Sequence, residues 1–299
     1  MVTKYASRLA VGIVLAGALG SAVPAARAAD LRPGDGAIEV VGTSEGFTMD
    51  GEHAAGFVTF QASSSHPAGA LYSLLQLRTE TALDDVLENL RRGISDDRAE
   101  SVAGGRSVQE QARLLGGAAV LPGQPVTFTS FLGPGTYHLV NYQDLREGGV
   151  RQAADRQRTL TITHRWDVVR APQVAATCVM TLGRDEAAFR MPATLPAGSA
   201  LRVVNAMSQL SEAVFMPVRP GTTRQQMQEF FNAADRGDFS VPPPFIGGPV
   251  GLPALGPGRT TVLRVALRPG DYTLVTWYPN FDDGTMLAAQ GQFAMVRIV

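Results

Sequence analysis

The chain has 299 residues, with 26 basic and 27 acidic side chains, and 45% of its residues are hydrophobic. This balance provides no basic surface for phosphates, so we expect no nucleic-acid partner. Lys4 is the only lysine and lies in the N-terminal segment, which excludes Schiff-base chemistry and P-loop phosphate binding from the rest of the chain. The single cysteine, Cys178, excludes an internal disulfide.

Residues 1–28 have the pattern of a secretory signal peptide. Two basic residues precede the apolar run 9–23, and Ala26-Arg27-Ala28 fits a cleavage site of small residues. We expect cleavage between Ala28 and Ala29, export by the general secretory route, and a secreted, extracellular protein without a membrane span after signal removal. A retained anchor is the alternative, although the apolar run is short for a span.

The remaining chain contains two copies of one unit. "LGPGTYHLVNYQD" (132–144) and "LRPGDYTLVTWYP" (267–279) share a Pro-Gly corner, a Tyr and a Leu-Val pair at an offset of 135, and other matched positions keep the same order. Small drifts in the offset are expected when loops absorb insertions. We predict a first domain at 29–163, a linker at 164–175 and a second domain at 176–299, each domain folding by itself.

In the first copy, segments rich in β-branched and aromatic residues predict strands at 57–62, 71–77 and 125–131. Thr81 and Asp84 have capping-box spacing, and four apolar residues after Thr81 share one face, which predicts a short helix. A further short helix is expected from Ser107 to the pair Gly116-Gly117.

The connection 164–175 contains Trp166, which we expect to pack at the junction of the two domains. In the second copy Cys178, Met180 and Leu182 alternate with Thr177, Val179 and Thr181. We therefore interpret Cys178 as a buried strand thiol; a reactive or intermolecular thiol is the alternative. Thr222 and Gln225 have capping-box spacing and predict the second helix. Further strands are expected at 200–205, 213–218 and 260–267.

These elements predict an all-β protein made of two tandem antiparallel β-sandwiches of Greek-key type, each with one inserted short α-helix. Four motifs then carry a resemblance: Asn-Ala-Met at 205–207 after a strand, Gly-Gly corners, the pattern L-x-P-G-x-Y-x-L-V, and a closing Asp-Gly segment before a last strand. Together they resemble the cupredoxin fold, specifically its secreted bacterial plastocyanin-like relatives.

The resemblance implies where copper ligands would lie. A Cys would follow the Tyr-x-Leu-Val strand, a His would precede an earlier strand, and a His and usually a Met would lie in the closing loop. The residues at these places are Asn141 and Thr276 for Cys, Ala70 and Ser211 near the His place, and Met286 and Gln292 in the closing segment of the second copy. Since type 1 copper depends on a thiolate and two imidazoles, we expect the copper ligands to be lost and no metal or cofactor to be bound.

The functional expectation is a non-catalytic module that binds an unknown extracellular ligand or protein, or has a structural role outside the cell. One alternative is a degenerate copper or redox protein that takes ligands from a partner or from His53, His66 and Cys178. A weaker alternative is a hydrolase through Ser44, because residues 42–46 match G-x-S-x-G. A hairpin turn explains that match equally, since a strand follows it.

Three aromatic residues, Trp277, Tyr278 and Phe281, follow the last matched strand of the second copy. We interpret Trp277 as filling the space of the lost metal site, whereas Tyr278 and Phe281 on a polar turn are typical of recognition anchors. A ligand or partner is therefore expected at this end of the second copy rather than at the matching end of the first. In the same loop, Asn280, Asp282 and Asp283 are interpreted as an Asx-rich turn rather than a Ca²⁺ site.

Overall fold

The computed structural model describes residues 36–167, 170–183 and 187–299. The predicted signal peptide and its cleavage site at Ala28 and Ala29 lie outside these ranges. Within them, every helix is too short or too polar to cross a membrane.

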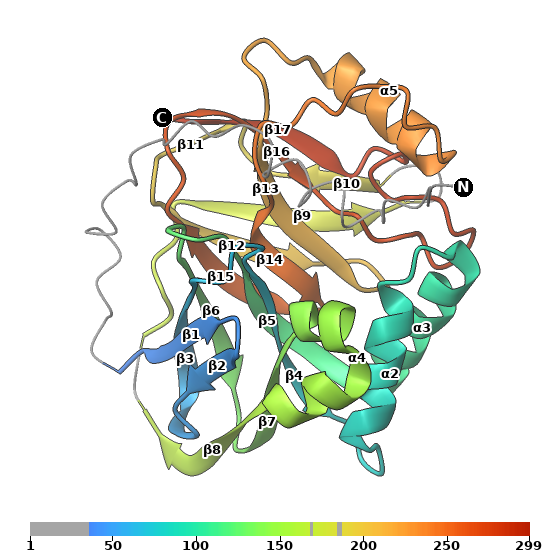
Figure 1. Cartoon of the computed structure of the whole chain (residues 1–299). Helices are drawn as coiled ribbons and strands as arrows, with labels where there is room; N and C mark the ends of the chain where they lie inside the picture. Colours follow the sequence, from blue (N-terminus) through green and yellow to red (C-terminus); the bar gives the residue numbers. More distant parts are fainter. Residues whose placement is uncertain (1–35, 168–169, 184–186) are drawn as a thin grey trace.

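Strands dominate the structure and form two matching series, coloured blue to green and yellow to red in Figure 1. The first half contains β1 (Ile38–Thr43), β2 (Gly46–Met49), β3 (Glu52–Ser64), β4 (Ala70–Leu77), β5 (Ala112–Val120), β6 (Val126–Leu132), β7 (Gly135–Asn141) and β8 (Arg158–Trp166). The second half contains β9 (Ala176–Leu182), β10 (Ala187–Arg190), β11 (Thr194–Leu195), β12 (Ala200–Asn205), β13 (Ser211–Pro217), β14 (Val250–Leu255), β15 (Thr260–Val265), β16 (Gly270–Val275) and β17 (Phe293–Ile298).

Each half is a sandwich of two sheets with the same strand order. The order is β2-β1-β3-β6 facing β3-β8-β7-β4-β5 in the first half, where the first residues of the long strand β3 pair with β8 in the second sheet. In the second half it is β10-β9-β12-β15 facing β11-β17-β16-β13-β14. Most pairs are antiparallel, and neighbours in a sheet are often distant in the chain, as in a Greek key. The predicted all-β class with two tandem sandwiches is confirmed.

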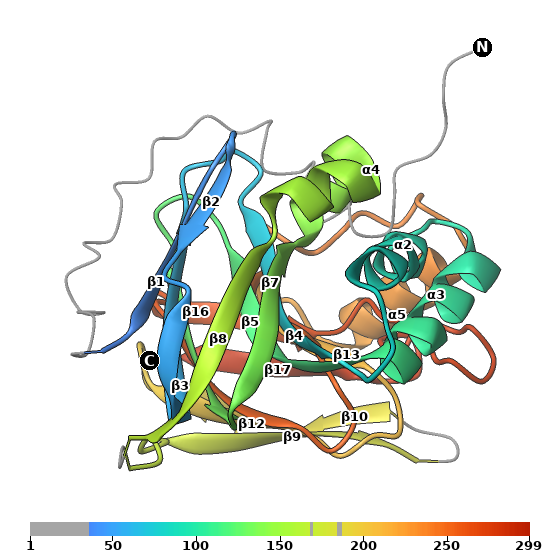
Figure 2. The ribbon, with the colours of Figure 1, turned by 90° about the horizontal axis from the view of Figure 1, so that it is seen from below.

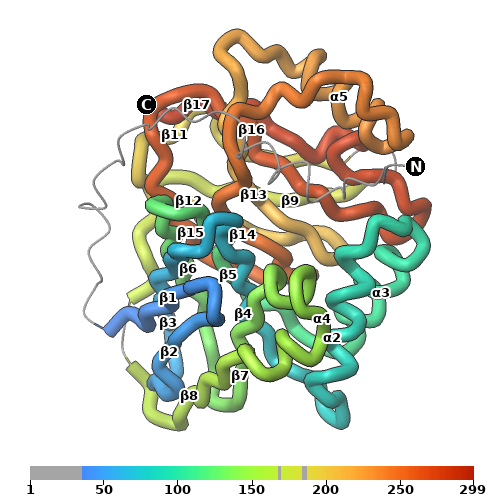
Figure 3. The backbone as a smooth tube through the Cα atoms, viewed as in Figure 1, coloured from blue at the N-terminus to red at the C-terminus, as the bar shows by residue number. Residues whose placement is uncertain are grey.

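Two further strand pairs, β5–β14 and β6–β15, join the halves into continuous sheets. Figure 3 shows the blue-to-green half of the chain directly beside the yellow-to-red half. In β6–β15, Phe128 lies opposite Leu263, and these positions are 135 apart, which is the offset between the matched motifs. On either side of this pair, the same offset relates Thr129 to Arg264 and Thr127 to Val262. The pair Thr129–Val262 is therefore the symmetry counterpart of the pair Thr127–Arg264. The halves are therefore related by an approximate twofold axis through this strand pair, as in an isologous dimer interface.

One hydrophobic core extends through both halves. It contains Phe60, whose ring stacks on Phe128 at 4.5 Å, together with Leu263 and Cys178 from the second half. Cys178 is fully buried on β9, and burial raises its pKa to about 12. The interpretation of Cys178 as a buried strand thiol is confirmed.

Helices cover one side of the sheets (Figures 1 and 2). They are α2 (Leu83–Gly93), α3 (Arg98–Gln111) and α4 (Tyr142–Arg156) in the first half and α5 (Arg224–Asp235) in the second. The expectation of one inserted helix is right for the second half and wrong for the first. In α4, Asn141 caps the N-terminus by accepting from Gln143 N at 3.1 Å, and Gly149 with φ 70° kinks the helix.

Three local predictions need correction. Thr223, not Thr222, caps α5, and Gln226 completes the capping box. Helix α2 starts after Ala82, whose methyl side chain accepts no hydrogen bond, so Thr81 is not its cap. The pair Gly116-Gly117 lies inside β5 instead of ending a helix.

Strand β8 continues to Trp166, three residues into the predicted linker. Trp166 is 54% exposed, and its ring lies 6.0 Å from that of Phe131, which is also exposed. The expectation that Trp166 packs at the junction is therefore wrong, because the paired strands and the common core join the halves.

Candidate functional site

In the second half, the places that the resemblance assigns to copper ligands form a buried hydrogen-bonded cluster. Ser211 Oγ lies 3.4 Å from Thr276 Oγ1 and 3.3 Å from Gln292 Oε1. Gln292 Nε2 donates to Met207 Sδ at 3.1 Å. These neutral groups satisfy one another and provide neither a thiolate nor an imidazole, so they do not fit a type 1 copper ion.

In the first half, the corresponding place has become a helix cap. Asn141 Oδ1, at the Cys place, accepts hydrogen bonds from Leu71 N at 3.0 Å and from Gln143 N. Ala70, near the His place, is a buried apolar residue at the start of β4. This half also offers no suitable set of ligands at the expected position.

The side chains proposed for a displaced copper site lie in separate environments. The His53 ring contacts the backbone oxygens of Ala54 at 2.8 Å and Gly36 at 3.1 Å. The His66 ring lies 3.7 Å from the Glu147 carboxylate, and Cys178 is enclosed in the core. In the part of the chain that the structure describes, no three His, Cys, Asp or Glu side chains gather.

Two other motifs form turns. Ser44 lies in the exposed turn of the antiparallel hairpin β1–β2, which is not the strand-turn-helix setting of a nucleophile elbow. Asn280 Oδ1 accepts from Asp282 N at 2.9 Å, and Asp283 Oδ1 accepts from Thr285 N at 2.8 Å. The hairpin and Asx-turn interpretations are confirmed.

The aromatic loop of the second half is largely buried. Trp277 packs between Phe231 and Phe245, with ring centroids 5.8 and 5.9 Å away. Phe281 is 6% exposed, because its ring packs against α3 at Gly105. The hypothesis that Phe281 is presented to a partner does not hold, since its ring joins the two halves instead.

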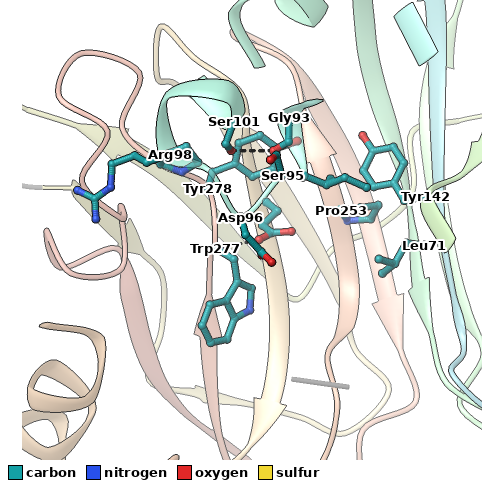
Figure 4. Close-up of a pocket in the computed structure, with 13 residues that line it drawn as sticks. Leu71, Gly93, Ser95, Asp96, Arg98, Ser101, Tyr142, Pro253, Trp277 and Tyr278 are labelled. Atoms are coloured by element: carbon teal, nitrogen blue, oxygen red, sulfur yellow. Dashed lines mark hydrogen bonds between the residues drawn. The ribbon is translucent and has the colours of Figure 1, made fainter. Parts of the chain in front are cut away.

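A small pocket of about 50 Å³ lies where the halves and the α2–α3 connection meet (Figure 4). Its lining residues are Leu71, Gly93, Ile94, Ser95, Asp96, Arg98, Ser101, Tyr142, Glu212, Pro253, Trp277, Tyr278 and Pro279. Tyr142 and Trp277 are matched positions 135 apart, and Leu71 and Glu212 are matched positions 141 apart. The pocket therefore lies near the approximate twofold axis. The two matched strand ends, one from each copy, form the walls of one site.

Glu212 is the buried acidic group of this pocket. Its side chain comes from β13, is 7% exposed, and its Oε1 accepts a hydrogen bond from Trp277 N at 2.6 Å. Burial raises the pKa of Glu212 to about 7, and the hydrogen bond from Trp277 opposes this rise. A carboxyl group in such a setting changes its charge near neutral pH.

Two phenols lie beside this carboxyl group. Burial raises the pKa of Tyr142 to about 12, and burial also raises the pKa of Tyr278, with the nearby Tyr142 and Glu212 adding to the effect. The Tyr142 hydroxyl is buried and makes no hydrogen bond of good geometry among the described residues, although the Ser73 and Tyr278 hydroxyls lie near it. Glu212 and Tyr142 were both missed as site residues. A glutamate inside the apolar strand sequence "SEAVFMP" is the signal that points to it.

The mouth of the pocket lies at the α2–α3 connection, where Asp96 is exposed. Arg98 belongs to the same rim, but its Nη2 donates to the backbone oxygen of Asp235 at 2.5 Å and to Asp235 Oδ1 at 3.0 Å. Figure 4 shows the Arg98 guanidinium directed away from Tyr142. The rim therefore contains an acidic side chain, Asp96, and an arginine, Arg98, that is directed away from Tyr142.

Comparisons with known proteins give only distant structural similarity. No family model and no curated protein matches the chain. Among solved structures, auracyanin from Roseiflexus castenholzii is 18% identical, covering 41% of this chain and 94% of its own, at a TM-score of 0.25. A copper nitrite reductase from Nitrosomonas europaea is 11% identical, covering 88% of this chain and 93% of its own, at a TM-score of 0.24. Scores this low carry no argument about metal binding or catalysis here.

Proposed function

We propose that this protein is a non-catalytic ligand-binding module, exported from the cell, whose binding site is the pocket between its two halves. The observation that carries this proposal is the composition of the pocket. Aromatic and apolar walls from both halves surround a few converging polar groups, Glu212, Tyr142 and Tyr278. Small-molecule sites commonly combine apolar walls with a few placed polar atoms and lie at domain interfaces. Export is inferred from the N-terminal pattern at residues 1–28.

The proposal assigns no redox role to the copper positions of the resemblance. In the second half these positions are filled by Ser211, Thr276 and Gln292, whose hydrogen bonds to one another would have to break before a metal could enter. Titration of the mature protein with copper tests this part. We expect no thiolate-to-copper absorption band at about 600 nm and no tight binding of one equivalent. An absorption band at about 600 nm, or tight binding of one equivalent of copper, would overturn the assignment and favour the degenerate copper protein.

A further inference from the structure

The pocket is asymmetric, because the two halves contribute different side chains at one pair of matched positions. At the matched positions of β4 and β13, the first half has Leu71 and the second half has Glu212, so the approximate twofold site contains one acidic side chain on its floor instead of two. Burying a single carboxylate is costly unless a partner compensates it. Burial is the main influence on the Glu212 pKa, and among the described residues no positive side chain contributes to it.

The groups around Glu212 are suited to a positive charge. Tyr142, Tyr278 and Trp277 line the same cavity, and faces of phenol and indole rings attract cations. The hydroxyl oxygens of Tyr142 and Tyr278 are acceptors for N–H donors. The Tyr142 hydroxyl in particular is buried and makes no well-oriented hydrogen bond within the described structure.

We propose that the pocket binds a small primary ammonium group, with the Glu212 carboxylate as its counter-charge and Tyr142, Tyr278 and Trp277 as its walls. This inference rests on the proposed function, because it names the ligand class of the same pocket. An ammonium group supplies three N–H donors. The Glu212 carboxylate and the two phenolic oxygens provide three acceptor groups for them.

The size of the cavity restricts the ligand. A volume of about 50 Å³ holds only a few water molecules, since one water needs roughly 10–15 Å³ by the same measure. This space suits a methylammonium or ethylammonium group, alone or at the end of a longer chain that leaves by the mouth. A quaternary ammonium is bulkier and has no N–H to donate, so it is expected to bind more weakly.

The charged and titratable groups that face the site set its pH dependence. They are Glu212 on β13, Tyr142 on α4, Tyr278 after β16, and Asp96 and Arg98 at the mouth, with Arg146 on α4 near Asp96. Among these, Glu212 is the group with a pKa of about 7. Binding of a cation requires its charged form. The affinity is therefore expected to fall about tenfold between pH 8 and pH 6, following the ionised fraction of the carboxyl group.

The test is titration of the full mature chain with ethylammonium chloride, ethanol and tetramethylammonium chloride at pH 8 and pH 6. Trp277 lines the pocket, so intrinsic fluorescence reports occupancy, and calorimetry gives an independent measure. We expect ethylammonium to bind most tightly, and the variant Glu212→Gln to weaken it at least tenfold at pH 8 while removing the pH dependence. The matched control Glu110→Gln, at an exposed position of α3 that does not line the pocket, should bind as the wild type does.

The outcomes separate this inference from the proposed function. Ethanol binding as tightly as ethylammonium, or unchanged binding in Glu212→Gln, overturns the ammonium inference and leaves the pocket as a ligand site. The inference is also overturned if none of the three probes shows saturable binding. The copper titration described above tests separately whether the protein lacks a redox copper site.

Discussion

At the scale of single residues, Glu212 links stability to pH. Its pKa is raised from 4.5 to about 7 by burial, so between these values the folded chain holds a proton that the unfolded chain has lost. The contribution of Glu212 to the free energy of unfolding therefore falls as pH rises from about 4.5 to 7 and does not change further above that range. Below pH 4.5 the carboxyl group is protonated in both states and has no effect.

The variant Glu212→Gln tests this assignment in the absence of ligand. Glutamine keeps an oxygen acceptor for Trp277 N but carries no charge to bury. We expect the variant to be more stable than the wild type at pH 8 by roughly 3 kcal/mol, since each pKa unit corresponds to about 1.4 kcal/mol. At pH 4 the two proteins should be equally stable in urea unfolding. A variant that is less stable than the wild type at pH 8 would contradict the raised pKa.

Gly117 shows how a single residue controls the close approach of neighbouring strands within one sheet, since β5 pairs with β4 of its own half and with β14 of the other half. A Cβ atom at this position would lie 2.0 Å from the backbone oxygen of Tyr72 and 2.9 Å from Pro253 of the second half. We expect Gly117→Ala to lower the free energy of unfolding by about 2–4 kcal/mol, because the clash involves backbone. Gly133→Ala is the control, since a methyl group added there would meet nothing within 4 Å. Comparable urea midpoints for the two variants would count against this packing.

At the scale of elements, the N-termini of α2 and α5 differ. A capping-box spacing occurs in the sequence before both helices, but a side-chain cap forms only at α5. Thr223 Oγ1 accepts from Gln226 N at 3.2 Å, and Gln226 Oε1 accepts from Thr223 N at 2.9 Å. We expect Thr223→Ala to cost about 1 kcal/mol of stability. Thr81→Ala should cost less than about 0.5 kcal/mol, because α2 begins after Ala82. Equal losses in thermal unfolding would show that Thr81 also caps its helix.

Helix α4, which the sequence patterns did not predict, lies beside the pocket and contributes Tyr142 to its lining. Helix α4 follows Asn141 directly, and its sequence "YQDLREGGVRQAADR" contains a Gly pair that suggests a loop. The helix forms because Asn141 caps it and because Leu145 and Ala153 pack into a cluster with α2. Tertiary burial thus overrides weak local propensity.

At the scale of the whole molecule, the shared sheets predict a single cooperative unit. Separating the halves would leave the inner edges of β5, β6, β14 and β15 unpaired and would expose a common core. We therefore expect residues 29–165 and 172–299, expressed separately, to aggregate or to unfold without a cooperative transition. The intact chain should give one transition in calorimetry. Two separate transitions, or two well-folded halves, would restore the independent domains expected from the repeat.

The class of the fold and the buried thiol at Cys178 could be predicted from the sequence, as could the internal similarity of the two halves and the presence of Asn141 and Thr276, rather than Cys, after the matched strands. These features depend on local alternation of apolar residues and on which residue types are present, and both can be counted along the chain. The predicted signal at residues 1–28 is of the same local kind and stays a prediction. The sequence also located two of the pocket residues, Trp277 and Tyr278, although for a different surface.

How the two copies meet, and therefore where the candidate site lies, could not be predicted without the folded structure. The edges of β5, β6, β14 and β15 pair through backbone groups, which are the same for almost every residue type and leave little trace in the sequence. This pairing brings Tyr142 and Glu212, 70 positions apart in the chain, into the lining of one pocket. Burial at that junction then gives Glu212 its raised pKa, because the cost of a buried charge depends on what surrounds it in space.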